Sequence, residues 1–169
     1  GDASLIQSRS AKEITLSPGG TFQDYVSFYF GVRSPMLYVI KNGFNNVAQR
    51  PQEEIIYIVS TFEKISSAGL SYVFFDGHGY HNVSTVYNKE TDISQIDWEA
   101  VKATKWNDTE EDPDLERRKQ AEILIHNEVP LECIVGIAVY NEEAKKKVEV
   151  ILHNADKNIK VIEKRDWYY

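Results

Sequence analysis

The chain has 169 residues and a mass of 19.4 kDa, enough for one domain with a substantial core. Its 42% hydrophobic and 27% charged residues exclude a disordered protein, and no apolar run approaches the roughly 20 residues that span a bilayer. The formal charge of −7 argues against a protein that coats nucleic acid through phosphate contacts alone. One cysteine, Cys133, excludes an internal disulfide and favours a reducing compartment, so we expect a cytoplasmic protein. The scattered histidines have no ligand spacing, so no metal site is expected.

The first half of the chain is rich in short apolar and aromatic runs. Ten tyrosines, seven phenylalanines and three tryptophans favour a sheet-rich core. Such runs predict strands at residues 25–30, 36–40, 55–60 and 72–75. Between the last two, residues 61–68 predict a short helix that is closed by Gly69.

The second half continues this alternation of short elements. Ser94, with Asp97 three residues later, resembles a helix N-cap and predicts a short helix through Trp98 and Val101. Further strands are predicted at residues 121–125, 134–139 and 159–162. After Asn141, apolar residues follow at helical spacing and predict the longest helix: Ala144, Val148, Ile151, Leu152 and Ala155. Residues 1–169 are therefore predicted to form a single α+β domain with six to eight strands and few helices.

Glu122 is a charged residue inside an apolar strand-like run. Burying a lone carboxylate is costly, so it needs a partner or a ligand. Strand alternation predicts that Gln120 and Glu122 share one face, directly after a polar loop. A Gln-x-Glu pair after such a loop resembles the catalytic signature of ADP-ribosyltransferases, and the resemblance implies that a fixed carboxylate favours the positive charge that develops on a sugar as its glycosidic bond breaks. The alternative is an edge-strand carboxylate paired with Arg117 or Arg118.

Three further side chains are candidates for binding. Arg33 lies at a break between predicted strands, and its guanidinium either binds phosphate in bidentate fashion or forms a structural ion pair. His78 lies in a predicted turn at the mouth of a strand, where Asp76 is expected to orient it toward a substrate. The aromatic strand at residues 28–30 either packs in the core or lines a pocket with one face, and in the second case Tyr29 is the exposed ring that stacks on a flat ligand.

Two charged runs flank the Glu122 strand. The acidic run at residues 108–114 lacks the glycine and terminal glutamate of a calcium loop and predicts a solvated loop. The basic run at residues 117–119 is either a solvated face or a contact for the phosphates of a nucleic acid.

Several segments, in this order, resemble the DarT family of bacterial toxins, which use NAD to ADP-ribosylate bases in single-stranded DNA. They are Gly19-Gly-Thr21, Tyr25-Val-Ser-Phe-Tyr-Phe30, Arg33-Ser-Pro-Met-Leu-Tyr38, Asp76-Gly-His78, Asp97-Trp98, Lys119-Gln-Ala-Glu122 and Trp167-Tyr-Tyr169. The resemblance spans nearly the whole chain, which makes it more specific than any one motif.

The resemblance implies an ADP-ribosyltransferase-like fold, with a split, mostly antiparallel sheet and NAD bound as a substrate between its halves. It implies that Glu122 is catalytic and that Arg33 positions NAD and the acceptor base. Tyr29 is a further NAD-binding candidate, and His78, Arg117 and Gln120 are candidates for contacting the DNA. The expected partners are single-stranded DNA and a macrodomain antitoxin similar to DarG.

The resemblance favours thymidine as the acceptor and leaves alternatives open. One is transfer to guanine in DNA, to RNA or to protein; another is a non-catalytic nucleic-acid- or nucleotide-binding module of the same fold. Members of the family also carry residues before the position matched by Gly1, including a histidine-containing segment that helps bind NAD. We therefore expect that N-terminal NAD-binding segment to lie outside this sequence.

Overall fold

The computed structural model describes residues 3–169 and divides into two compact units, each with its own sheet. The first unit contains the chain up to Met36 together with residues 70–128, and the second contains residues 37–69 and 129–169. Each unit is thus built from two separate stretches of chain. No helix formed by residues 3–169 is both long and apolar enough to cross a membrane.

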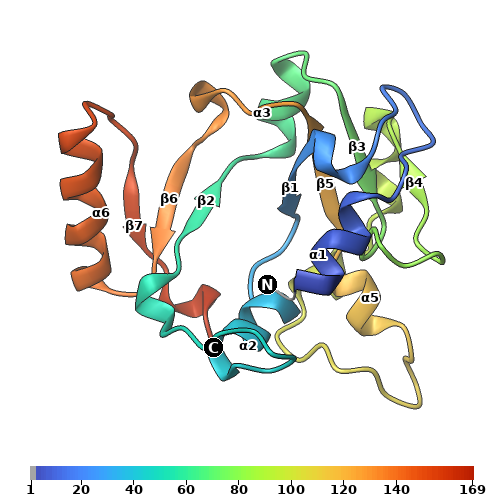
Figure 1. Cartoon of the computed structure of the whole chain (residues 1–169), viewed down its shortest axis with the longest axis horizontal. Coiled ribbons are helices and arrows are strands. Elements are labelled where there is room, and N and C mark those ends of the chain that lie inside the picture. The colour runs from blue at the N-terminus through green and yellow to red at the C-terminus, as the bar shows by residue number, and fades with distance from the viewer. Residues whose placement is uncertain (1–2) are drawn as a thin grey trace. The chain divides into compact units, whose positions relative to one another are not determined.

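An antiparallel four-stranded sheet forms the centre of the first unit (Figure 1). In spatial order its strands are β1 (Tyr25–Tyr29), β5 (Glu122–His126), β3 (Tyr72–Phe75) and β4 (Val86–Tyr87). Glu122 is the first residue of β5 and pairs in register with Tyr29 on one side and Phe75 on the other. It therefore lies in the interior of the sheet, not on an edge strand.

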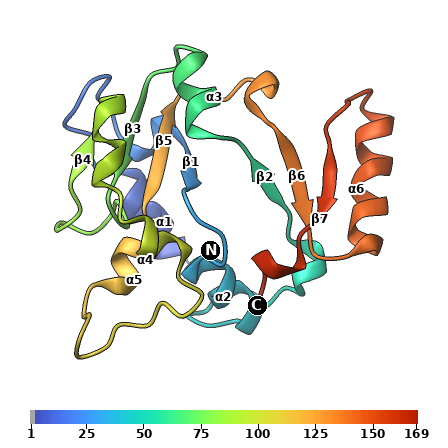
Figure 2. The ribbon, with the colours of Figure 1, turned by 180° about the vertical axis from the view of Figure 1, so that it is seen from behind.

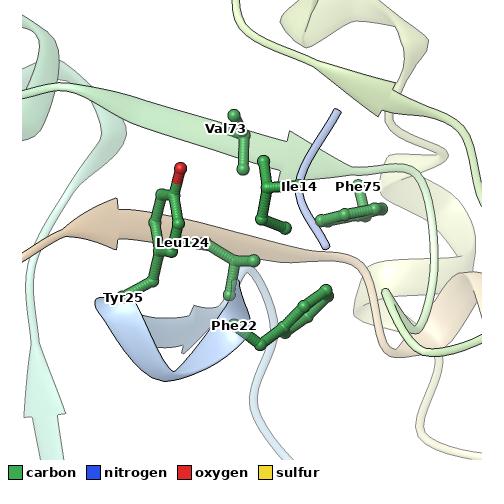
Figure 3. Close-up of a cluster of buried hydrophobic side chains, with 6 residues drawn as sticks. All are labelled: Ile14, Phe22, Tyr25, Val73, Phe75 and Leu124. Carbon is green, nitrogen blue, oxygen red and sulfur yellow. The ribbon is translucent and has the colours of Figure 1, made fainter. Parts of the chain in front are cut away.

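One face of this sheet carries a cluster of buried apolar side chains (Figure 3). The cluster comprises Ile14, Phe22, Tyr25, Val73, Phe75 and Leu124. The rings of Phe22 and Phe75 stack with centroids 5.6 Å apart. Because alternate residues of a strand share a face, Glu122 lies on the same face as Leu124. The carboxylate therefore borders an apolar cluster.

Short helices surround the ends of these strands. They are α1 (Ala3–Ser10), α4 (Trp98–Lys102) and α5 (Leu115–Lys119), with 3-10 turns at Phe22–Asp24 and Glu90–Gln95. α4 and α5 pack against each other (Figure 2). The predicted N-cap at Ser94 is wrong, since Oδ1 of Asp97 accepts hydrogen bonds from the N–H groups of Glu99 and Ala100 and begins α4.

Residues 36–40, predicted as a strand, belong to the helix α2 (Pro35–Asn42). Proline is favoured at the first position of a helix, because its missing N–H has no helical partner there. Leu37 is buried and Tyr38 is exposed. A short apolar run of this kind does not distinguish a strand from a helix by its periodicity.

The second unit has a three-stranded sheet in the order β2 (Tyr57–Val59), β6 (Gly136–Val139) and β7 (Val161–Glu163). α3 (Phe62–Ser67) follows β2, and 3-10 turns lie at Gln52–Glu54, Leu131–Cys133 and Arg165–Trp167. α6 (Glu142–Asn154) runs beside β7 (Figure 1). Ala144, Val148 and Leu152 of α6 pack on this sheet, but Ile151, predicted for the same face, is 65% exposed, and Ala155 is exposed as well.

The predicted fold class is confirmed. Across residues 3–169 there are seven strands, and four of the five strand pairings are antiparallel, with only β6 and β7 parallel. The same residues form six α-helices, of which only α6 is longer than eight residues. A split, mostly antiparallel sheet with short flanking helices is therefore the observed architecture.

Candidate active site

Both carboxylate oxygens of Glu122 accept hydrogen bonds, although the residue is only 1% exposed. Oε1 accepts from the backbone N–H of Gly79 at 2.8 Å, and Oε2 accepts from Nη2 of Arg9. The guanidinium of Arg9 also lies over the ring of Phe22, 4.7 Å from its centroid. The predicted alternative, an edge-strand glutamate paired with Arg117 or Arg118, is wrong, since the partner comes from α1.

Gly79 allows this arrangement because it has no side chain. A Cβ at this position would lie 2.8 Å from Oε1 of Glu122, and about equally close to the rings of Phe22 and Phe75. Lys12 holds the glycine from the other side, where its Nζ donates to the carbonyl oxygen of Gly79 at 2.7 Å. The peptide groups of Gly79 are therefore held by two side chains, Glu122 at the N–H and Lys12 at the carbonyl oxygen.

Tyr29 faces Glu122 across the β1–β5 ladder. Burial, followed by the charge of Glu122, raises the pKa of the Tyr29 hydroxyl to about 12. The hydroxyl is therefore a neutral hydrogen-bonding group at neutral pH. The ring of Tyr29 is half-buried, so the prediction of an exposed ring is wrong.

His78 lies in the loop after β3, as expected, and it is buried. Burial, and then the positive charge of Arg9, lowers the pKa of His78 to about 4, so its imidazole is neutral at neutral pH. Its Nδ1 accepts a hydrogen bond from the N–H of Tyr80 at 3.2 Å. Asp76 does not orient His78, because its Oδ1 accepts instead from Arg117 and from the N–H of Thr85.

Arg117 ties this loop to α5. Its Nε and Nη2 each donate to the carboxylate of Asp114 at 2.7 Å, and Nη1 donates to Asp76 at 3.0 Å and to Ser84 at 3.1 Å. Its carbonyl oxygen accepts from the N–H of His78 at 2.9 Å. Arg117 is therefore engaged within the chain, and its predicted contact with DNA stays a prediction.

Arg118 of α5 forms ion pairs both with the acidic run and with the N-cap residue of α4. Its guanidinium pairs with Asp97 at the start of α4 and with Asp112 and Asp114 in the loop before α5. Lys119 is buried, and its Nζ donates to the carbonyl oxygen of Val101 at 2.7 Å. The predicted solvated acidic loop is confirmed for residues 108–111 and 113, which are exposed, whereas Asp112 and Asp114 are half-buried and paired with arginines. The predicted solvated basic face is wrong, because Arg117 and Arg118 are paired with carboxylates and Lys119 is buried.

Strand alternation predicted that Gln120 lies on the same strand as Glu122, and this is wrong because β5 begins at Glu122. Gln120 is the C-terminal cap of α5, with φ −95° and ψ 21°, and its Nε2 donates to the carbonyl oxygen of Glu116 at 3.2 Å. Gln120 lines a pocket of about 330 Å³, which we call the Gln120 pocket. The other lining residues are His81, Val83, Asp108, Pro113, Asp114, Glu116 and Arg117.

Arg33 lies in the bend between β1 and α2 with a φ of 52°, a left-handed conformation that is uncommon for a residue other than glycine. Such outliers concentrate at functional sites, where the surrounding structure holds them. Burial, and then the charge of Arg33, lowers the pKa of Lys119 to about 8. The structure thus brings two cationic side chains near each other in the first unit.

Sequence reasoning missed Arg9, Lys12 and the role of Gly79. Arg9 lies 113 residues from Glu122 in the sequence, in a helix with no apolar stripe, so no local pattern marks it. The glycine pair around His78 was visible but predicted only a turn. Residues 3–169 contain no group of three or more residues that could hold a metal ion.

The whole chain, residues 1–169, matches the protein family described as "ssDNA thymidine ADP-ribosyltransferase, DarT". A DNA ADP-ribosyl transferase of Thermus sp. (strain 2.9) is 37% identical over 169 residues, covering 99% of this chain and 79% of that protein. The structure of Thermus sp. 2.9 DarT in complex with ADP-ribosylated ssDNA matches with a TM-score of 0.93 and 35% identity, covering 100% of this chain and 80% of that one. Its complex with NAD+ matches with a TM-score of 0.89 and 36% identity, covering 95% and 80%. The resemblance found in the sequence is confirmed.

Proposed function

The chain belongs to the DarT family of NAD-dependent ssDNA thymidine ADP-ribosyltransferases, and on that premise we propose that Glu122 is its catalytic residue. The observation that carries the proposal is a carboxylate that is 1% exposed, borders an apolar cluster and is held by a backbone N–H and an arginine. A carboxylate fixed in such surroundings stabilises positive charge more strongly than the same group in water.

In the proposed reaction, the negative charge of Glu122 acts on the ribose of NAD that is attached to nicotinamide. The bond between ribose C1′ and the nicotinamide nitrogen breaks, and its electron pair leaves with nicotinamide. Positive charge develops on the ribose, as in glycoside hydrolysis, and Glu122 stabilises it. A nitrogen of the acceptor base bonds to C1′ and releases its proton to solvent. If that nitrogen lies on the Watson–Crick edge, it is blocked in a duplex, so the substrate is unpaired DNA.

Arg9 is the group that must move before a sugar reaches Glu122. The carboxylate is covered, and the Gly79 donor belongs to the backbone, whereas the side chain of Arg9 is 19% exposed and has a path to solvent. We infer that substrate displaces Arg9 from Oε2 while the Gly79 N–H continues to hold Oε1.

The remaining candidates have proposed roles. Arg33 and Tyr29 are proposed to bind NAD, and the left-handed backbone of Arg33 supports a functional role for it. His78, Arg117 and Gln120 are proposed to border the DNA. A macrodomain antitoxin similar to DarG and a cytoplasmic site of action are further proposals, and the family resemblance supports them.

The test is incubation with NAD and single-stranded oligonucleotides that contain thymidine, followed by mass spectrometry. We expect a gain of one ADP-ribose on DNA, its loss in Glu122→Gln, and its retention in Glu128→Gln, an exposed glutamate of the same unit. Removing one electrostatic contact to a transition state typically costs about 100- to 1000-fold in rate. Equal rates for the two variants would reject Glu122 as the catalytic residue, and ADP-ribose found only on RNA or protein would reject the acceptor.

A further inference from the structure

The second unit carries two neighbouring aromatic side chains on its surface. Phe44 is 49% exposed and Tyr38 is 37% exposed. The centroids of these two rings lie 5.9 Å apart, and on its other side the ring of Tyr38 meets the ring of Tyr169 edge-on at 5.1 Å. We call Tyr38 and Phe44 the aromatic platform. Exposed rings that are supported from behind offer flat faces on which another flat ring can stack.

A pocket of about 460 Å³ adjoins the aromatic platform, and we call it the Lys41 pocket. Its lining residues are Lys41, Gln49, Arg50, Pro51, Gln52 and Glu53. The buried side chain of Gln52 holds Tyr169 at both peptide groups, since its Oε1 accepts from the N–H at 2.7 Å and its Nε2 donates to the carbonyl oxygen at 2.5 Å. Because Tyr169 also contacts Tyr38, one residue links the pocket wall to the platform.

Two cationic side chains meet in this pocket. Arg50 is placed beside α2, the helix of Lys41, because its N–H donates to the carbonyl oxygen of Ile40 at 3.1 Å. Within residues 3–169, Lys41 forms no ion pair. Arg50 pairs with Glu54 at 3.7 Å, but both side chains are more than half exposed, and such a pair contributes little. Of the lining residues that the structure describes, only Glu53 carries a carboxylate. Both cations are therefore available to an anion.

We propose that the aromatic platform and the Lys41 pocket bind a nucleotide of the single-stranded DNA other than the acceptor thymidine. Its base stacks on Phe44, and its phosphate lies between Lys41 and Arg50. The proposal rests on the proposed function and adds a second contact with the same substrate. Aromatic rings beside cations hold single strands without selecting a sequence, because every base has a flat face. In a duplex those faces are covered by neighbouring base pairs, so the platform favours unpaired DNA.

The first test measures binding to Glu122→Gln by fluorescence anisotropy, with single-stranded oligonucleotides of about 5 to about 20 nucleotides that contain one thymidine. We expect the affinity to rise about tenfold once the strand is long enough to reach the platform. Phe44→Ala and Lys41→Gln should each remove most of this gain. The controls are Ile151→Ala and Lys146→Gln, which alter exposed residues of α6 and should retain the gain. A gain that persists in folded Phe44→Ala and Lys41→Gln would overturn the inference.

The second test locates the contact by photocrosslinking. An iodouracil base, which crosslinks to aromatic rings on which it stacks, replaces each base of a long oligonucleotide in turn, and mass spectrometry identifies the modified peptide. We expect a crosslink to Tyr38 or Phe44 that excess NAD does not reduce. Competition by NAD would assign the platform to NAD and overturn the inference.

ADP-ribose transfer by the unaltered chain is measured alongside. Transfer without any crosslink at Tyr38 or Phe44 would overturn this inference and leave the proposed function intact. Neither transfer nor binding with any oligonucleotide would overturn both.

Discussion

Arg9 of α1 pairs with Glu122 of β5, 113 residues later, and so ties the start of the first unit to the middle of its sheet. The pair is partly buried, with the side chains of Arg9 and Glu122 19% and 2% exposed. The arginine also rests on the ring of Phe22. One guanidinium therefore compensates the buried charge and packs against the apolar cluster.

Replacing Arg9 by alanine should destabilise the chain, because it leaves a buried carboxylate with only the Gly79 N–H. We expect a loss of about 1–3 kcal/mol in the free energy of unfolding, measured by urea denaturation. The matched control is Arg50→Ala, which removes an exposed pair with Glu54 at 3.7 Å and should change stability by less than about 1 kcal/mol. Equal losses in the two variants would show that the Arg9 pair is no stronger than a surface contact.

Replacing Gly79 by alanine should impair ADP-ribose transfer more than stability alone explains. The new methyl group would stand 2.8 Å from Oε1 of Glu122 and so displace either the carboxylate or the N–H that holds it. The control is Gly69→Ala, where no atom lies within 4 Å of the added Cβ and φ is 67°. That variant should lose about 1 kcal/mol of stability and keep its rate per folded molecule. A normal rate for folded Gly79→Ala would contradict the role of the Gly79 donor.

His78 should make the chain sensitive to acid. Its pKa is about 4 in the folded chain against 6.5 for an ordinary histidine, so the unfolded state binds the proton first. Above pH 6.5, where His78 is neutral in both states, its full contribution to the free energy of unfolding is present. This contribution is lost as the pH decreases from 6.5 towards about 4, and the loss is about 3 kcal/mol at most. His78→Asn should flatten unfolding free energy over this range, whereas the exposed His153→Asn should not. Parallel pH profiles for the two variants would refute this.

The sequence predicted that Glu122 needs a partner because a charge inside an apolar run is costly wherever the strand lies. That prediction depends only on neighbouring residues, and it is confirmed because Glu122 is paired. The identity of the partner depends on the tertiary structure, because Arg9 reaches Glu122 only after α1 and the sheet have assembled. The second partner of Glu122, the N–H of Gly79, is a backbone hydrogen-bond donor, which no side-chain pattern reveals.

The errors in the secondary-structure predictions have a shared physical cause. Residues 36–40 form a short apolar run, and such a run is compatible with a strand or a helix until its neighbours bury one side of it. Gln120 was assigned to a strand by extending the alternation of β5 backwards, but α5 continues to Lys119, and Gln120 caps it. Where one short element follows another directly, the boundary depends on tertiary contacts more than on sequence.

Arg118 should hold the loop before α5 in place through its pairs with Asp97 and Asp112. Arg118→Ala should therefore increase trypsin cleavage after Lys105, which precedes the acidic run, because local opening exposes the loop. Lys145→Ala, which removes the pair with Glu149 at 3.9 Å on α6 of the second unit, is the control and should leave cleavage there unchanged. Resistance of the Arg118 variant at this site would mean that other contacts fix the loop.

The dependence of DNA binding on salt should be shallow for a protein that modifies DNA. The basic side chains beside the candidate site are already engaged: Arg117 binds Asp76 and Asp114, and Lys119 binds a backbone carbonyl oxygen. Each phosphate contact to a single strand contributes about −0.7 to the slope of log K against log salt concentration. We expect a slope no steeper than about −3 between about 50 and 200 mM salt, measured with a labelled oligonucleotide and Glu122→Gln to prevent turnover. A slope near −6 would require many phosphate contacts, and it would mean that Arg117 and its neighbours exchange their internal partners for DNA.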